Sequence, residues 1–347
     1  MIHPQHDQKK TIKAGVEIML SAVRGIPDHL VRGGQLVVGV HSKITQPIAR
    51  VTLCALGGSA FPGEFIKWMT DAHDVPFSIS RSYRVERGKV SARDLIIASS
   101  FSGNTEETLS SLEDALERGA QVVTVCAGGQ LERWSIERDL PMVKLHKPTE
   151  QFQPRAASGY FLGVISGLLE DLGLIKCART RLAQVAAELK GLMDVTEEAR
   201  TIASALHERI PVFYASPPYA ESLARVAKIK VNENAKCPAF WNEIPEFNHN
   251  EMVGYTRLHH PLTAVFFDDP LASPRMRQRV TQSVGTLKEY GVDTLVIPIR
   301  SAQDPLTSLL ATLYLLDEVS CELAVQSGVD PNPVTMIEEF KAALGPS

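Results

Sequence analysis

The stretch DLIIASSFSGNTEETLSSLEDALER, Asp94–Arg118, decides the fold of this 347-residue chain. It opens with an apolar run that predicts a buried strand. Leu109 and Leu112 then recur near helical spacing within an expected helix over 104–118. The short polar turn SFSGN separates the two. A strand, a tight turn and a helix in this order are half of a βαβ unit, which predicts a parallel sheet covered by helices.

The same rhythm continues on both sides of this stretch. Further strands are predicted at VTLCAL (from Val51), QVVTVCA (from Gln121), PMVKL (from Pro141), PVFYAS (from Pro211), TAVFFD (from Thr263) and TLVIPI (from Thr294). Helices are predicted over 13–23, 219–234 and 305–326, in a stretch ending near 290, and as a short last helix after Pro333.

The length of the chain exceeds what one hydrophobic core usually supports, so two domains are expected. A helix-rich stretch over about 156–203 separates two runs of strands. We therefore predict an α/β protein of two doubly wound domains, residues 1–175 and 176–347, each with a mainly parallel sheet flanked by helices.

Composition excludes several classes of protein. The net charge of −4 gives no basic excess for binding a nucleic acid backbone. The five cysteines are scattered and form no CxxC pair, so we expect no zinc site, no disulfide framework and no metal or other cofactor. No apolar run approaches the ~20 residues that span a bilayer, and the polar N-terminus lacks the core of a signal peptide. A cytoplasmic location without membrane contact is expected.

The polar turn after the strand at Asp94 is the strongest candidate for a binding site. Ser100, Ser102 and Thr105 bring three hydroxyls to a turn that Gly103 permits. The helix that follows directs its unpaired N–H groups and its positive dipole end forward, which suits a phosphate. The alternative is an ordinary helix cap by Asn104 or Thr105.

Two other segments add candidates around this turn. In LGGSAFPGE, Leu56–Glu64, Gly58 allows a close backbone approach and Ser59 supplies a hydroxyl, and neighbouring parallel strands bring such loops to one edge. In FQPRAASGY, Arg155 lies near a predicted helix start, where a cation is disfavoured by the dipole. Arg155 is either tolerated at the surface or directed at substrate oxygens.

Residues 228–252, KIKVNENAKCPAFWNEIPEFNHNEM, hold the candidates for proton transfer. Glu233 ends a helix with an apolar face, a setting in which a carboxylate can exchange a proton near neutral pH. His249, in the loop-like NHN, could move a proton on a sugar oxygen. Glu243, Glu246 and Glu251 remain rival carboxylates. Neighbouring His259 and His260 would point to opposite faces of a strand, so no metal site is expected there.

Several of these segments, in the same order, resemble motifs of the archaeal and bacterial bifunctional phosphoglucose/phosphomannose isomerases, which belong to the sugar isomerase (SIS) domain superfamily. GGSAFPGE is similar to the family's GGSGxxGD, SSFSGNTEET to SYSGNTEET, QPRAASGY to QPRAALGY, VNENAKCPAF to INENAKxPAF and PEFNHNE to PELNHNE. The resemblance runs from about Val51 to the C-terminal helix. It implies two SIS-type domains and a metal-independent isomerase that interconverts glucose 6-phosphate or mannose 6-phosphate with fructose 6-phosphate through a cis-enediol.

The resemblance also implies a role for each matched residue. The phosphate would be held by Gly58, Ser59, Ser100, Ser102 and Thr105. Glu233 would move the proton between C1 and C2, Arg155 would stabilise the enediolate-like intermediate, and Lys341 on the last helix would act at the ring oxygen or in substrate binding. His249, which would assist ring opening, comes from the neighbouring subunit of a homodimer in this family.

The sequence departs from the family in both loops. Ala60, Phe61 and Pro62 stand in place of small, glycine-rich positions of the first loop, where Glu64 also replaces an aspartate, and Phe101 replaces a tyrosine in the phosphate loop. Bulk at Phe61 could change which sugar fits. Two alternatives therefore stay open: a sugar-phosphate-binding regulator without catalysis, and an isomerase of another sugar phosphate.

Overall fold

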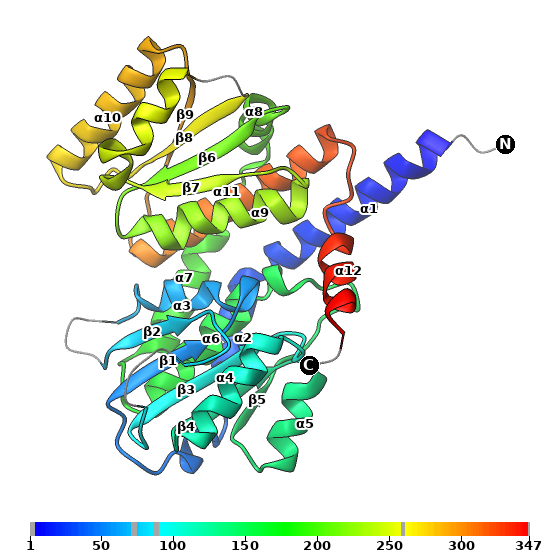
Figure 1. The fold of residues 1–347 in the computed structure, drawn as a ribbon, viewed down its shortest axis with the longest axis vertical. Coiled ribbons are helices and arrows are strands. Elements are labelled where there is room, and N and C mark those ends of the chain that lie inside the picture. The colour runs from blue at the N-terminus through cyan, green and yellow to red at the C-terminus, as the bar shows by residue number, and fades with distance from the viewer. Residues whose placement is uncertain (1–3, 71–74, 86–89, 258–260, 346–347) are drawn as a thin grey trace. The chain divides into compact units, whose positions relative to one another are not determined.

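The computed structural model describes residues 4–70, 75–85, 90–257 and 261–345, and the chain divides into two compact units. Residues 24–187 form a unit around a five-stranded sheet, together with the last residues from 344. Residues 1–23 and 188–343 form a unit around a four-stranded sheet. Figure 1 labels the elements of both. The prediction of an α/β protein with parallel sheets flanked by helices is confirmed.

The five-stranded sheet has the order β2-β1-β3-β4-β5, and every neighbouring pair is parallel. Its strands are β1 (Arg50–Cys54), β2 (Phe77–Ser80), β3 (Asp94–Ser100), β4 (Gln121–Cys126) and β5 (Met142–Lys144). Its helices are α2 (Ile26–Gln35), α3 (Phe61–Ile66), α4 (Glu106–Glu117), α5 (Gly129–Glu137) and α6 (Ser158–Asp171), with the short turns η1 (Val40–Lys43), η2 (Gly57–Ser59) and η3 (Pro154–Ala156) and the connecting helix α7 (Ala178–Lys190).

The core of this unit lies on both faces of β3, whose seven residues are all buried. On one face, Ile96 and Ala98 pack with Leu109 and Leu112 of α4. On the other side of the unit, α2 and α6 approach backbone to backbone, because a Cβ at Gly163 would lie 2.4 Å from the carbonyl oxygen of Leu30. Glycines in both helices therefore allow close packing.

The four-stranded sheet has the order β7-β6-β8-β9 and is also parallel throughout. Its strands are β6 (Ile210–Ala215), β7 (Phe240–Glu243), β8 (Leu262–Asp268) and β9 (Asp293–Pro298). The other elements of the unit are α1 (Pro4–Arg24), α8 (Thr196–Leu206), a π-helical turn η4 (Ala220–Ala224), α9 (Arg225–Ala235), η5 (Glu246–His249), η6 (Glu251–Arg257), α10 (Pro274–Glu289), α11 (Pro305–Gln326) and α12 (Thr335–Leu344).

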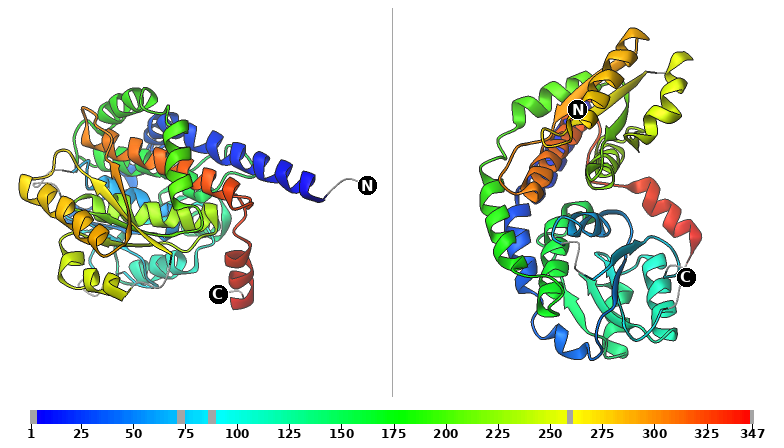
Figure 2. Two further views of the ribbon diagram at one scale, coloured as in Figure 1. Left: turned by 90° about the horizontal axis from the view of Figure 1, so that it is seen from above. Right: turned by 90° about the vertical axis from the view of Figure 1, so that its left-hand side faces the viewer.

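Helices cover both faces of the four-stranded sheet. Figures 1 and 2 show α10 on one face and α9 with α11 on the other. α1 belongs to this unit although it begins the chain, since Asn332 Nδ2 donates a hydrogen bond to the Gly15 carbonyl at 2.8 Å. α12 has no buried residue. Within the described residues, no helix combines the length and apolar character needed to cross a bilayer.

All seven predicted strands are present, and the structure adds two strands that were not predicted. β2 and β7 are edge strands, and their residues are mostly half-buried or exposed. A strand that packs on one neighbour needs few apolar residues, so its sequence lacks the apolar run that marks a central strand.

Candidate active site

Three loops of the five-stranded unit leave the sheet at the same edge. Because β1, β3 and β4 are parallel neighbours, their carboxyl ends lie side by side. β1 leads into η2, β3 leads into the polar turn over 101–105, and β4 leads into Gly128 and Gly129. The convergence of the two predicted binding loops at one edge is thus a consequence of strand order.

The three hydroxyls predicted to hold a phosphate lie together at the start of α4. Ser100 Oγ is 2.8 Å from Thr105 Oγ1 and 3.5 Å from Ser102 Oγ. Gly103 adopts a φ of +69°, and its N–H donates to Ser100 Oγ at 3.1 Å. Ser100 is buried, Thr105 is half-buried and Ser102 is exposed, so the hydroxyl cluster reaches the surface.

No side chain caps the start of α4. Thr105 occupies the N-cap position, but its hydroxyl pairs with Ser100 instead of an N–H of the first helical turn. Asn104 Oδ1 instead accepts a hydrogen bond from the Gln130 N–H, at 2.9 Å, at the start of α5. Thr105 is thus the N-cap residue that the alternative interpretation named, but it does not make the side-chain hydrogen bond of an ordinary cap. A helix start without a side-chain cap is suited to an external anion.

The loop after β4 supports the polar turn, and the sequence analysis did not identify it. A Cβ at Gly103 would lie 1.8 Å from the Gly128 carbonyl oxygen, and a Cβ at Gly129 would lie 2.3 Å from that of Ser102. The Leu131 N–H donates to the Gly103 carbonyl at 2.9 Å. The two glycines that follow a predicted strand were the available signal for this close backbone contact.

Ser59 joins the two predicted binding loops. Its hydroxyl accepts a hydrogen bond from the Phe101 N–H at 3.1 Å, and the residue is buried. Ser59 therefore sets the position of the polar turn relative to η2, whatever else its hydroxyl contacts.

Arg155 lies against the first loop. A Cβ at Gly58 would come within 2.7 Å of Arg155 Cα and 2.8 Å of the Pro154 carbonyl oxygen, so only glycine fits there. Arg155 is part of η3, immediately before α6, and is 3% exposed. Its Nη1 donates to Gln153 Oε1 at 3.3 Å. Gly58 thus positions Arg155 through the backbone.

The two phenylalanines that depart from the family motifs are buried. The Phe101 ring packs at 5.5 Å from the Phe152 ring and 6.3 Å from the Phe161 ring, measured between centroids. Phe101 therefore connects the polar turn to the segment that carries Arg155. Phe61 lies in α3 and is 4% exposed.

A histidine that the sequence analysis did not single out packs against Phe152 and Tyr160, the residues on either side of Arg155 in the segment over 152–160. His29 of α2 is buried and stacks on Tyr160 of α6 with ring centroids 4.1 Å apart. Burial, and secondarily the charge of Arg32, lowers the pKa of His29 to about 4, against a smaller opposing effect of Asp28. The imidazole is therefore neutral at physiological pH and acts as an aromatic packing group.

Glu233 belongs to the four-stranded unit, in the last turn of α9, and is half-buried. The neighbouring face of α9 is fixed to α11: Lys230 forms a buried ion pair with Asp317, and Asn234 Nδ2 donates to Ser320 Oγ at 2.8 Å. These contacts set the rotation of α9 about its axis and so the direction of Glu233.

His249 ends η5 and is exposed. A buried polar network holds the loop next to it. The hydroxyl of Tyr214 contacts both Glu251 Oε1 and, at 2.7 Å, the hydroxyl of Tyr255, while Asn242 Nδ2 donates to Glu251 Oε2 at 2.5 Å. Burial, together with these neighbours, raises the pKa of Tyr214 far above its usual range. Glu251, one of the rival carboxylates, is therefore committed to structural hydrogen bonds.

Glu233 and His249 lie at opposite ends and on opposite faces of their sheet. α9 connects the carboxyl end of β6 to the amino end of β7, so Glu233 lies near the amino end. His249 follows the carboxyl end of β7, and Asn248 beside it accepts a hydrogen bond from Arg279 of α10. α9 and α10 cover different faces (Figure 1). One copy of the chain does not bring the two residues together.

The remaining predicted residue, Lys341, lies on α12 and is exposed. The five-stranded unit therefore holds Gly58, Ser59, Ser100, Ser102, Thr105 and Arg155, and the four-stranded unit holds Glu233, His249 and Lys341. Among the described residues, no group of three or more histidine, cysteine, aspartate or glutamate side chains is arranged to hold a metal ion. His259 and His260 lie outside the described residues.

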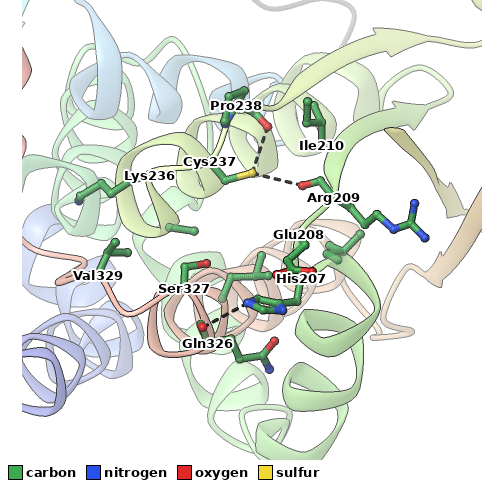
Figure 3. Close-up of a pocket in the computed structure, with 13 residues that line it drawn as sticks. His207, Glu208, Arg209, Ile210, Lys236, Cys237, Pro238, Gln326, Ser327 and Val329 are labelled. Atoms are coloured by element: carbon green, nitrogen blue, oxygen red, sulfur yellow. Dashed lines mark hydrogen bonds between the residues drawn. The ribbon is translucent and has the colours of Figure 1, made fainter. Parts of the chain in front are cut away.

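A cavity of about 570 Å³ lies in the four-stranded unit, beside the end of α9 that carries Glu233, since Lys236 in its lining donates a hydrogen bond to the Glu233 carbonyl (Figure 3). It is formed where α8, α9 and α11 end. His207 Nε2 is 3.2 Å from the Gln326 carbonyl oxygen in its wall, and Cys237 Sγ donates to the Arg209 carbonyl at 3.3 Å. None of the residues predicted from the sequence lines it.

Comparison with known proteins adds three findings. The family model "bacterial phospho-glucose isomerase C-terminal SIS domain" matches residues 195–344. The chain is 30% identical over 340 residues to a bifunctional phosphoglucose/phosphomannose isomerase of Caldicellulosiruptor bescii, covering 94% of this chain and 98% of the relative. It is also 30% identical over 311 residues to a protein of the same name from Aquifex aeolicus, covering 87% and 92%.

A solved structure shares the fold. The C-terminal domain of glucosamine-fructose-6-phosphate aminotransferase from Francisella tularensis superposes with a TM-score of 0.70 at 14% identity, covering 90% of this chain and 97% of that one. At this identity the likeness concerns the fold alone.

Proposed function

We propose that this chain, which belongs to the bifunctional phosphoglucose/phosphomannose isomerase family, interconverts glucose 6-phosphate and mannose 6-phosphate with fructose 6-phosphate. The observation that carries the proposal within that family is the start of α4, where three hydroxyls lie together and no side chain caps the helix. This arrangement suits the dianionic end of a hexose 6-phosphate.

The phosphate anchors the substrate by an end that does not react. Ser100, Ser102 and Thr105 donate hydrogen bonds to its oxygens, and the N–H groups of the first turn of α4 add further donors. Binding energy from this remote group fixes the position of C1 and C2 for the chemical step.

The chemical step moves protons and needs no net oxidation. After the sugar ring opens, Glu233 removes the proton from C2 of the aldose and a cis-enediol forms. The same carboxylate returns the proton to C1, while a proton passes from the C2 hydroxyl to O1, which gives the ketose. Arg155 offsets the negative charge on the enediolate oxygens. Glucose and mannose 6-phosphates share this enediol, so one base serves both.

His249 and Lys341 complete the proposed site. Lys341 binds the substrate near the ring oxygen, and His249 of a second copy assists ring opening in a homodimer. Supply of His249 by a second copy is supported by the separation of Glu233 and His249 within one sheet, and by the exposure of His249. The interconversion is a step of glycolysis and gluconeogenesis, and we propose that the enzyme works there, in the cytoplasm.

An assay with glucose, mannose and fructose 6-phosphates tests the function, and Glu233→Gln tests the base. Removing a general base lowers the rate by about 10²- to 10⁴-fold, so we expect kcat to fall within that range with little change in KM. Glu243→Gln, a change of a rival carboxylate in β7, is the matched control and should keep near-normal activity. Near-normal turnover of Glu233→Gln would refute the assigned base.

The same assay separates the alternatives. A regulator without catalysis would be stabilised by fructose 6-phosphate but would not convert it. An isomerase of another sugar phosphate would convert a different substrate faster than all three hexose 6-phosphates.

Mixing two inactive variants tests the shared site. If Glu233 and His249 of different copies form each site, a mixed dimer of Glu233→Gln and His249→Ala contains one site with both residues intact. Random mixing then restores up to about a quarter of wild-type activity, because half of the dimers are mixed and each has one intact site. Activity that stays at the level of the separate variants would contradict the shared site.

A further inference from the structure

The polar turn at the start of α4 offers neutral hydrogen-bond donors but no positive side chain. Its hydroxyl residues are uncharged, and the first turn of α4 carries Glu106 and Glu107, which oppose the positive end of the helix dipole. A phosphate monoester near pH 7 carries roughly −1.5 to −2 charges. A cation at the same sheet edge would balance this charge.

Arg81 lies at that edge. β2 ends at Ser80, which pairs with Cys54 of β1, and Cys54 pairs in turn with Ala98 of β3. Arg81 is therefore level with Ser99 of β3, the residue before Ser100. Two strand spacings, or about 10 Å, separate Arg81 from Ser99 across the sheet. An extended arginine side chain spans most of that distance.

A buried carboxylate holds Arg81 in this place. Glu64, five residues after Ser59, is 3% exposed, and its Oε1 accepts a hydrogen bond from Arg81 Nη2 at 2.7 Å. Its Oε2 accepts from Lys67 Nζ at 2.6 Å. Burial alone would raise the pKa of Glu64, but the hydrogen bonds from Lys67 and Arg81 outweigh it and lower the pKa. Two cations around one carboxylate leave one positive charge in excess.

Arg81 keeps the capacity for another ligand. Its side chain is 27% exposed. Among the residues that the structure describes, Glu64 is its only hydrogen-bond partner, and a guanidinium has five N–H donors in a fixed fork. Such a fork matches the oxygens of a phosphate.

The segment that follows Arg81 runs beside α4. Ser111 Oγ donates to the Ser82 carbonyl at 2.7 Å, and Asp114 Oδ2 accepts from the Val85 N–H at 3.1 Å. The pKa of the Tyr83 phenol is raised by desolvation and then by the charges of Glu106 and Glu107, so Tyr83 lies near the first turn of α4. Arg81 is thus held between α3 and the helix whose start carries the hydroxyl cluster.

We propose that Arg81 is a further substrate-binding residue, whose guanidinium contacts the phosphate at the start of α4, and that Glu64 is its positioning residue. The identity of the substrate rests on the proposed function, whereas the contact with a phosphate does not.

Arg81→Met tests the contact, with Arg84→Met as the matched control because Arg84 is an exposed arginine three residues further along the same segment. The measurements are the rise in melting temperature that inorganic phosphate causes, relative to each variant without phosphate, and kcat and KM for fructose 6-phosphate. Loss of a charge-assisted hydrogen bond predicts a KM raised about 10- to 100-fold, and a much smaller phosphate-induced shift, with little change in kcat. Arg84→Met should match the wild type in both.

A double variant guards against misfolding. Arg81→Met leaves Glu64 with one cation, which could destabilise the unit by itself. Glu64→Gln with Arg81→Gln removes the whole ion pair and leaves neutral partners of similar shape, and it should show the same loss of phosphate response.

An unchanged phosphate-induced shift and KM in both variants would show that Arg81 only anchors Glu64, and would overturn the inference. Failure of the proposed function gives a different result: the wild type would respond to phosphate through Arg81 but would convert none of the three hexose 6-phosphates.

Discussion

Two helices of the four-stranded unit, α10 and α11, begin differently from α4 of the five-stranded unit, whereas α5 and α9 also begin without a side-chain cap. In the four-stranded unit, α10 is capped by Ser273, whose hydroxyl accepts from the Met276 N–H, and α11 is capped by Asp304, whose carboxylate accepts from the Leu306 N–H at 2.8 Å. In the five-stranded unit, Thr105 stands at the same position of α4, but its hydroxyl pairs with Ser100.

On the proposed function, the same architecture serves two purposes. A helix capped by its own side chain has satisfied its first N–H groups and needs nothing else. A helix whose cap residue joins a hydroxyl cluster is left with donors for an external anion. On the proposed function, the composition of a single turn, rather than the topology of the sheet, separates a structural helix start from a binding one.

The largest effect should come from breaking the turn itself. In Gly103→Ala, the new Cβ would lie 1.8 Å from the Gly128 carbonyl oxygen, and the residue would keep an unfavourable φ of +69°. The turn must move, and a displacement of about 1 Å in a positioning group can cost about 100-fold. We expect kcat/KM for fructose 6-phosphate to fall by at least about 100-fold in a steady-state assay.

Gly285→Ala in α10 is the control in the other unit. Nothing lies within 4 Å of a Cβ at Gly285, and alanine favours a helix. Activity should be unchanged and the melting temperature equal or higher. Equal losses in the two glycine variants would show that the effect of Gly103→Ala does not come from the turn at the start of α4.

Low pH should destabilise the five-stranded unit, because His29 becomes protonated. The pKa of His29 is about 4 in the folded protein and 6.5 in an unfolded chain. Stability contributed by the neutral imidazole is therefore complete above pH 6.5 and is lost as the pH falls toward 4, in total roughly 3 kcal/mol.

Urea unfolding at pH 7 and pH 4.5 measures this loss. His29→Phe keeps a ring against Tyr160 and has no proton to bind, so it should lose less stability than the wild type over that interval. If the pH dependence of stability in His29→Phe equals that of the wild type, protonation of His29 does not cause the loss of stability in acid.

The smallest effects should separate the two kinds of cap. Ser273→Ala should lower the free energy of unfolding by about 1 kcal/mol without changing KM, because it removes a structural cap. Thr105→Val should raise KM by about 10-fold, since it removes a hydrogen bond to a charged ligand, and should change stability less. The same pattern in both variants, a loss of stability with constant KM, would mean that Thr105 has only a structural role.

Much of this fold could be predicted from the sequence, because central strands of a parallel sheet are continuous apolar runs. β3 and β4 are examples, and α11 matches its predicted bounds, residues 305–326. The edge strands β2 and β7 lack such runs and were not predicted. The contact between Ser100 and Thr105 was expected, because the two residues are close in sequence and lie on either side of the turn at Gly103.

Contacts between residues distant in sequence could not be predicted. The support of Gly103 by Gly128, the stacking of His29 on Tyr160 and the ion pair between Glu64 and Arg81 each join separate elements. Local spacing carries no information on which of many charged or aromatic residues will meet. Such contacts follow from strand order and helix packing, which only the folded chain defines.

A crystal structure of the protein with fructose 6-phosphate tests the central claim most directly. We expect the phosphate at the start of α4, with its oxygens within hydrogen-bond distance of Ser100 Oγ, Ser102 Oγ and Thr105 Oγ1. A phosphate bound instead in the cavity lined by His207 and Cys237, with the start of α4 empty, would contradict the claim.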